Sequence, residues 1–112
     1  MMKYKYGDIV LVEFLYSESN VTKKRPALVI SSNNYNNKRK EILIAAITSN
    51  IKRVLYGDTK IENWQETGLK FSSLVTGIVQ TVRQRMINRK LGVFSKKDLQ
   101  NVESNLKKIV SF

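Results

Sequence analysis

The chain contains no cysteine and no histidine among its 112 residues. The absence of cysteine excludes disulfides, thiolate metal sites and cysteine nucleophiles. The absence of histidine removes a common zinc ligand and the side chain best suited to proton transfer near neutral pH. Any catalysis must therefore use arginine, lysine, hydroxyl groups or carboxylates, and we expect neither a metal nor a cofactor.

Long apolar runs are also missing. No segment approaches the roughly 18 apolar residues of a membrane-spanning helix, and residues 1–8 lack the apolar centre of a signal peptide. We therefore expect a cytoplasmic protein with no membrane partner. The chain has no linker rich in proline, glycine or serine, and its length suits one compact unit, so residues 1–112 are expected to form a single domain.

Acidic residues are scarce compared with basic ones. Twenty lysines and arginines stand against nine aspartates and glutamates, which gives a formal net charge of +11. Such an excess attracts phosphate backbones and makes their binding strongly salt-dependent. Nucleic acid, an anionic membrane and an acidic protein segment all remain possible partners, and some basic domains use their charge for solubility. Nucleic acid ranks first because no long basic amphipathic helix dominates the sequence.

Short runs rich in β-branched residues predict four or five strands. Pro26 has no N–H and fits only at the start or edge of a strand, so one strand should begin near Arg25. Gly77 lies inside another run and suggests a bulge or a close approach by another group. Residues 33–40 read as a polar loop. The expected strands are residues 9–14, 25–31, 41–48, 73–82 and, less clearly, 59–61.

A single convincing helix should close the chain. Ser95 and Asp98 form an S-x-x-D pattern typical of a helix N-terminus. Apolar residues then recur at helical spacing, namely Leu99, Val102, Leu106, Ile109 and Val110. Short strands followed by one terminal helix, without strand–helix alternation, predict an α+β or small β-barrel domain.

Three separated blocks carry a family resemblance. They are Gly7-Asp8-Ile9-Val10-Leu11-Val12, then residues 23–31 (KKRPALVIS) with Tyr35-Asn36, then residues 45–49 (AAITS). In this order and spacing the chain resembles the MazF/PemK toxins, and the likeness continues through Gly68-Leu69, Ser72, residues 79–82 and residues 89–95. It therefore covers nearly the whole sequence.

The resemblance implies an SH3-like barrel of the CcdB/PemK type with a C-terminal helix. It also implies a homodimer that cleaves single-stranded RNA without metal and is neutralised by an acidic antitoxin protein. In that reaction the ribose 2′-hydroxyl attacks the neighbouring phosphorus, which needs a base, an acid and a group that stabilises the phosphorane.

Arg25 and Thr48 are the catalytic candidates that the resemblance implies. Arg25 matches the arginine of the family's R-P pair and would hold phosphoryl oxygens bidentately, while Thr48 matches the I-T-S threonine and would donate a hydroxyl hydrogen bond. Taken singly, each also fits an ordinary strand residue. The residues expected to bind substrate are Lys23, Lys24, Ser49, Lys52 and Arg53.

Other candidates carry weaker signals. The basic cluster at residues 38–40 lies in a loop of unknown direction, and Tyr16, Tyr35 and Trp64 either stack on bases or pack the core. Glu18 is the carboxylate nearest in sequence to the expected site, although an exposed loop carboxylate with a pKa near 4 is a weak base.

Departures from the family keep other functions open. Many relatives carry an arginine and an acidic residue where this chain places Val75 and Gly77. A module that binds nucleic acid without cleaving it is therefore an alternative. A gyrase poison of the CcdB type on the same fold is another, because fold alone does not determine function.

Overall fold

The computed structural model describes residues 3–16 and 21–112. Its main element is a six-stranded antiparallel sheet with the order β4-β5-β3-β2-β1-β6. The strands are β1 (Asp8–Tyr16), β2 (Val21–Val29), β3 (Glu41–Thr48), β4 (Thr59–Lys60), β5 (Leu74–Arg83) and β6 (Ile87–Val93). The helices are α1 (Asn33–Lys38) and α2 (Lys96–Leu106), with 3-10 turns η1 (Trp64–Glu66) and η2 (Gln84–Met86).

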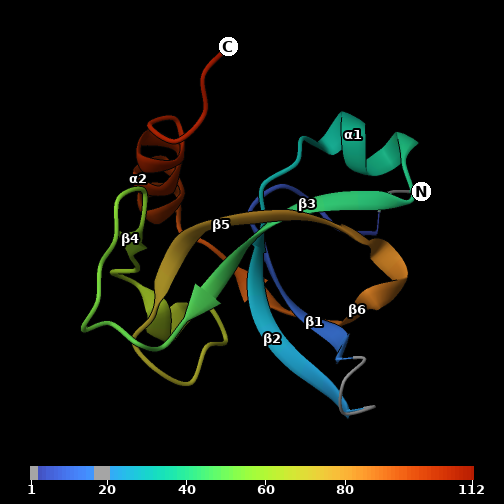
Figure 1. Ribbon diagram of the computed structural model, residues 1–112, viewed down its shortest axis with the longest axis horizontal. Helices are drawn as coiled ribbons and strands as arrows, with labels where there is room; N and C mark the ends of the chain where they lie inside the picture. Colours follow the sequence, from blue (N-terminus) through green and yellow to red (C-terminus); the bar gives the residue numbers. More distant parts are fainter. Residues whose placement is uncertain (1–2, 17–20) are drawn as a thin grey trace.

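The sheet is strongly curved but not closed. Within the described residues β4 and β6 do not pair with each other, so each leaves one edge open. Figure 1 shows the strands bending around the interior, with α2 beside β4 and β5 and α1 near the opposite end of β3. The predicted class, an α+β barrel-like sheet with a C-terminal helix, is confirmed, and the barrel is a loose one.

Two apolar clusters form the core, one on each face of the sheet. Strand residues alternate between the faces, so Val10 and Val12 belong to the first cluster while Ile9 belongs to the second. The second cluster also contains Val102 of α2, which is almost fully buried. Burial of this stripe explains why α2 packs against the sheet rather than standing in solvent.

The second strand begins earlier than its sequence suggests. We predicted a start near Arg25, but β2 starts at Val21, and Pro26 lies inside it opposite Leu11. A proline is tolerated there because β3 pairs with β2 only from Ala27 onward, which leaves the β3-facing flank of β2 open at Pro26.

The polar stretch after β2 is not only a loop. Asn33–Lys38 forms the short helix α1, whose N-terminus is capped by Ser32 through a hydrogen bond from the Tyr35 amide. The sequence did not predict this helix because its residues are polar turn formers. It buries only Asn36, so it has no apolar stripe at helical spacing. A sixth strand, β6, also escaped prediction, because residues 87–93 alternate too weakly between apolar and polar.

The irregularity predicted at Gly77 is confirmed. Ala45 pairs with Val79 and Ile47 pairs with Val75, so three residues of β5, centred on Gly77, face Ala46 alone. A β-bulge of this kind bends the strand.

The segment after η1 is held tightly against β6. A Cβ atom at Gly68 would lie 2.2 Å from the Leu91 carbonyl oxygen, and one at Gly92 would lie 2.3 Å from that of Thr67. The two backbones can approach so closely only because both positions are glycine. This contact positions residues 67–73, which we call the site loop, beside β6.

The C-terminal helix begins as expected. Ser95 is its N-cap and accepts a hydrogen bond from the Asp98 amide at 3.1 Å. Residues 109 and 110 lie beyond its end at Leu106. No helix in the described part of the chain is long and apolar enough to cross a bilayer.

Candidate active site

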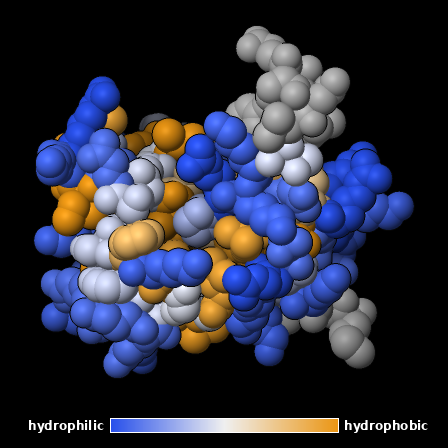
Figure 2. Space-filling model, turned by 90° about the horizontal axis from the view of Figure 1, so that it is seen from below, coloured by the Kyte–Doolittle hydropathy of each residue, from blue (hydrophilic) through white to orange (hydrophobic). Residues whose placement is uncertain are grey.

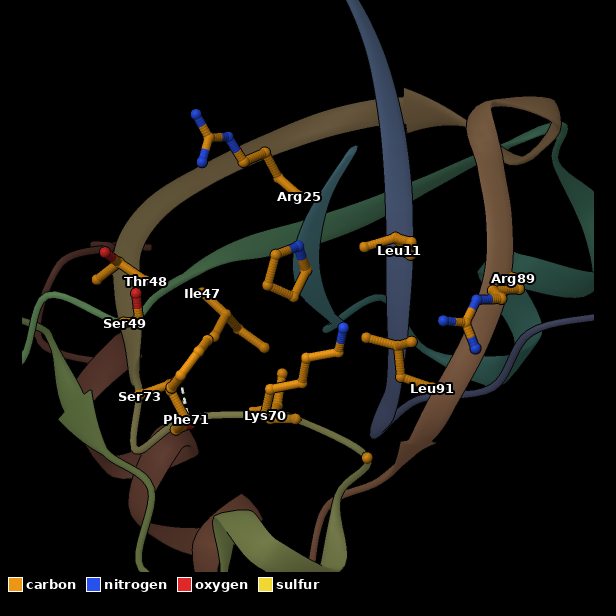
Figure 3. A pocket seen from close by; sticks show the side chains of 13 residues that line it. Leu11, Arg25, Ile47, Thr48, Ser49, Lys70, Phe71, Ser73, Arg89 and Leu91 are labelled. Atoms are coloured by element: carbon orange, nitrogen blue, oxygen red, sulfur yellow. Dashed lines mark hydrogen bonds between the residues drawn. The ribbon is translucent and has the colours of Figure 1, made fainter. Parts of the chain in front are cut away.

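A pocket of about 350 Å³ opens where the end of β3 and the site loop meet β1, β2 and β6. Its floor is apolar, and its rim carries cations and hydroxyl groups (Figure 3). The lining residues are Leu11, Arg25, Pro26, Ile47, Thr48, Ser49, Gly68, Leu69, Lys70, Phe71, Ser73, Arg89 and Leu91. Seen from below, the molecule has a largely hydrophilic surface with apolar patches between the polar side chains (Figure 2).

Arg25 is exposed and comes from the open flank of β2. It lies opposite Val12, one residue before Pro26 and two before the pairing with β3 begins at Ala27. Because no β3 residue pairs with it, its side chain is free to reach over the strand edge. Among the described residues it has no carboxylate partner, so its guanidinium is available to bind an anion.

Thr48 is the last residue of β3 and is half-buried. Its Oγ1 accepts a hydrogen bond from the Asn50 amide at 3.2 Å, which orients the hydroxyl and leaves its proton to donate to a ligand. Ser49 follows it on the same rim. An adjoining pocket of about 450 Å³ is also lined by Arg25 and Thr48, so these two residues border both pockets.

Two further cations line the pocket although the sequence did not point to them. Lys70 comes from the site loop and Arg89 from β6, and in Figure 3 both side chains extend over the same opening. Neither forms a salt bridge within the described residues. No acidic residue is among the described residues that line the pocket. The arrangement therefore concentrates positive charge, as an anion-binding site does.

Phe71 lies on the same rim and is 65% exposed. Its backbone carbonyl accepts a hydrogen bond from the Ser73 hydroxyl at 2.8 Å, and the Leu69 amide donates to the Thr67 hydroxyl at 3.2 Å. These bonds order the site loop. An exposed aromatic ring held beside cations is the kind of platform on which nucleic acid bases stack.

The other predicted substrate-binding residues lie outside this pocket. Lys23 and Lys24 lie further out on β2, opposite Phe14 and Glu13. Lys52 and Arg53 are exposed in the loop that follows β3. Of the seven predicted site residues, the structure brings together Arg25, Thr48 and Ser49.

The positions that depart from the family pattern have structural roles. Val75 is fully buried in the second core cluster. An added Cβ at Gly77 would lie 3.3 Å from Ile109.

The remaining candidates lie elsewhere. Trp64 packs against the second cluster, and the Tyr35 ring lies under the Arg39 guanidinium at 5.3 Å. Glu18 and the side chain of Tyr16 lie outside the described residues.

Comparison with known proteins agrees with this fold. The mycobacterial structure described as the Mycobacterium tuberculosis toxin MazF-mt6 is 17% identical, with a TM-score of 0.76 over 94% of this chain and 99% of that one. A MazE-MazF structure from Deinococcus radiodurans is 19% identical, with a TM-score of 0.79 over 95% and 94%. An endoribonuclease in complex with its cognate antitoxin, from a mycobacterial species, is 13% identical, with a TM-score of 0.74 over 94% and 92%.

At these identities the structural likenesses establish a shared fold. A comparison with curated proteins gave no match. The model of one family, described as the PemK-like, MazF-like toxin of type II toxin-antitoxin systems, matches residues 5–110. The chain therefore belongs to the PemK/MazF family of type II toxins.

Proposed function

We propose that this toxin is an endoribonuclease that cleaves single-stranded RNA in the pocket between β2, β3 and the site loop. The observation that carries the proposal is the position of Arg25 and Thr48. They come from different strands, yet both line this one cationic pocket and the adjoining one. A scissile phosphodiester at their junction would contact both side chains.

The reaction is an internal transesterification. The ribose 2′-oxygen bonds to the adjacent phosphorus, the bond from phosphorus to the 5′-oxygen breaks, and the products are a 2′,3′-cyclic phosphate and a 5′-hydroxyl. The 2′-hydroxyl proton leaves to a base, and the 5′-oxygen takes up a proton. Arg25 stabilises the charge that grows on the phosphoryl oxygens, and Thr48 donates a hydrogen bond to the same group.

The remaining polar groups of the pocket bind the substrate. Lys70 and Arg89 contact the phosphates beside the scissile one, Ser49 supplies a further hydroxyl, and Phe71 stacks on a base. Among the described residues the lining contains no carboxylate, histidine or cysteine, and we assign charge stabilisation to the cations of the protein. The proton acceptor is unassigned, because Glu18 lies outside the described residues.

The pocket proposed to bind RNA is also the expected target of an antitoxin. Structural neighbours are described as complexes of MazE with MazF and of an endoribonuclease with its cognate antitoxin. An acidic segment would be attracted to the three pocket cations Arg25, Lys70 and Arg89 and would exclude RNA, at the cost of ordering that segment. We further propose a homodimer, since Tyr56 and Ile78 are large apolar residues that stay mostly exposed.

Incubation of the purified toxin with a long RNA tests the proposal. The wild type should produce fragments that end in a cyclic phosphate, whereas Arg25→Ala and Thr48→Val should slow cleavage by at least about 100-fold, since loss of a charge-stabilising donor has this effect. Lys96→Ala, which removes an exposed cation from the start of α2, serves as the matched control. A single 2′-deoxy substitution at a mapped cut site should abolish cleavage there. Equal survival of the RNA with wild type and Arg25→Ala would refute the proposal.

A further inference from the structure

A second cationic pocket lies far from the candidate active site. It has a volume of about 340 Å³ and is formed between the end of α1 and the turn that joins β5 to β6. Figure 1 shows these two segments on the same side of the molecule. Its polar lining includes Asn37, Arg39, Lys40, Arg83, Gln84 and Arg85.

The walls of this pocket are held in place by hydrogen bonds. The Gln84 side-chain amide donates to the backbone carbonyls of Asn36 and Arg39, both at 2.9 Å, and the Gln84 backbone amide donates to the Lys40 carbonyl at 2.8 Å. These bonds satisfy carbonyls at the end of α1. They also fix the segment that carries Arg39 and Lys40 to the turn that carries Arg83 and Arg85.

Most cations of the pocket form no salt bridge within the described residues, although Arg83 lies directly opposite Glu41 in the sheet. Arg39 pairs with Glu41 at 3.1 Å and lies over the Tyr35 ring, so its guanidinium is oriented but partly neutralised. Within the described residues Lys40, Arg83 and Arg85 have no carboxylate partner. Within the described residues, Glu41 is therefore the only carboxylate that forms a salt bridge with one of these cations.

We propose that this pocket binds the phosphate backbone of RNA that extends beyond the active site. The inference rests on the proposed nuclease function, because it assigns the same polymer to both pockets. Arginines bind phosphate oxygens bidentately, and three of the four cations are arginines. An acidic protein segment is the weaker candidate, because every lining residue is polar and a segment that folds on binding also needs apolar surface to bury.

The spacing of the two pockets suits one RNA strand. Glu41, beside this pocket, and Thr48, in the active site, are the first and last residues of β3. At about 3.3 Å per residue the two ends of β3 lie roughly 23 Å apart. A stacked strand rises about 3.4 Å per nucleotide, so about seven nucleotides reach from one pocket to the other. Short RNA should therefore miss the second pocket, and long RNA should occupy it.

Binding of uncleavable RNA tests this inference separately from catalysis. The probes are 2′-O-methyl RNAs of about 24 and about 5 nucleotides, lengths that bracket this span, titrated at several salt concentrations. The Arg83→Ala/Arg85→Ala double variant should bind the long probe on the order of 10-fold more weakly. Its slope of log affinity against log salt should fall by about 1.4, because each single-strand phosphate contact contributes about 0.7. Affinity for the short probe should not change.

Two matched variants separate binding from general effects. Arg83→Lys/Arg85→Lys keeps the charge and should retain most of the salt slope. Lys96→Ala/Lys108→Ala removes two exposed cations elsewhere and should lower affinity for both probes equally and slightly. Thermal unfolding establishes that each variant is folded.

Three outcomes would overturn the inference. They are an unchanged salt slope for the long probe, an equal loss for the two probes, and a loss seen with a polyglutamate peptide but not with RNA. None of these readouts depends on cleavage. A wild type that binds long RNA through Arg83 and Arg85 but leaves cleavable RNA intact would refute the nuclease and keep this site.

Discussion

Arg89 on β6 lies directly opposite Leu11 on β1. Leu11 in turn lies opposite Pro26 on β2, and side chains of paired residues share one face of a sheet. Arg89 lies on β6, an edge strand of the sheet, and this pairing brings it into the pocket that also contains Pro26 and its neighbour Arg25. Strand register therefore places Arg89 beside Leu11 and Pro26, while Arg25, which pairs with Val12, joins the pocket from the open flank of β2.

Arg89→Ala should weaken the enzyme without unfolding it. Arg89 is exposed and makes no salt bridge within the described residues, so the melting temperature should stay close to that of the wild type. Loss of a charge-assisted hydrogen bond to phosphate removes about 1.5–3 kcal/mol, so kcat/KM for RNA cleavage should fall about 10- to 150-fold. Steady-state kinetics of Arg89→Ala beside Arg89→Lys and Lys96→Ala provide the measurement. A kcat/KM within twofold of the wild type would remove Arg89 from the site.

Asp98 should be a major determinant of stability. It is fully buried, and its carboxylate oxygens accept hydrogen bonds from the amides of Glu62 and Asn63, each at 2.9 Å. Asp98→Ala leaves these two donors without partners and should cost about 2–4 kcal/mol in the free energy of unfolding. Urea denaturation measures the change. Ser95→Ala removes the helix cap and the hydrogen bond that the Ser95 hydroxyl accepts from the Asn63 side-chain amide. It should cost about 1 kcal/mol, and an equal effect of the two substitutions would contradict this account.

Gly92→Ala should disturb both stability and activity. The added Cβ would lie 2.3 Å from the Thr67 carbonyl oxygen, so the site loop must move away from β6. Overpacking of this kind costs about 1–3 kcal/mol, and the displaced loop carries Lys70 and Phe71, so RNA cleavage should slow as well.

Gly77→Ala is the matched control for Gly92→Ala. Its Cβ would meet only the flexible end of Ile109 at 3.3 Å and a backbone oxygen at 3.7 Å. Both variants can be compared by thermal unfolding and by cleavage rate. If Gly77→Ala proves more damaging than Gly92→Ala, the close packing of the site loop against β6 does not explain the effect of Gly92→Ala.

The hydrogen bond from the Tyr6 hydroxyl to Glu103 links the N-terminal segment to α2. Burial raises the pKa of Tyr6 above its usual value, and the hydrogen bond and negative charge of Glu103 raise it further. A raised pKa means that the folded state holds the phenolic proton more tightly than the unfolded state does. The stabilisation is therefore complete below about pH 10, the ordinary pKa of tyrosine, and is lost as the pH rises above it.

Tyr6→Phe tests this linkage. The substitution should lower the melting temperature near neutral pH, and the difference from the wild type should shrink as the pH is raised from 9 to 11. Thermal unfolding followed at several pH values gives both curves. A difference that stays constant over this range would show that Tyr6 contributes only through packing.

Local sequence was sufficient for much of the fold and for part of the site. The apolar β-branched runs predicted β1, β3 and β5, and Ser95 marked the start of α2, because strand and cap preferences depend on neighbouring residues. Arg25, Thr48 and Ser49, which line one pocket, were predicted as site residues from short motifs whose residues stay together in the chain. Apolar periodicity did not predict α1, because this helix of six polar residues is held by capping hydrogen bonds rather than by an apolar stripe.

The tertiary structure alone decided which distant residues share a surface. Lys70 and Arg89 reach the pocket of Arg25 because glycine contacts hold the site loop to β6 and because β6 pairs with β1 in one register. The cations of the second pocket meet for a similar reason, since Gln84 joins their two segments. Such positions follow from pairing and packing between segments far apart in sequence, which the preferences of neighbouring residues do not encode.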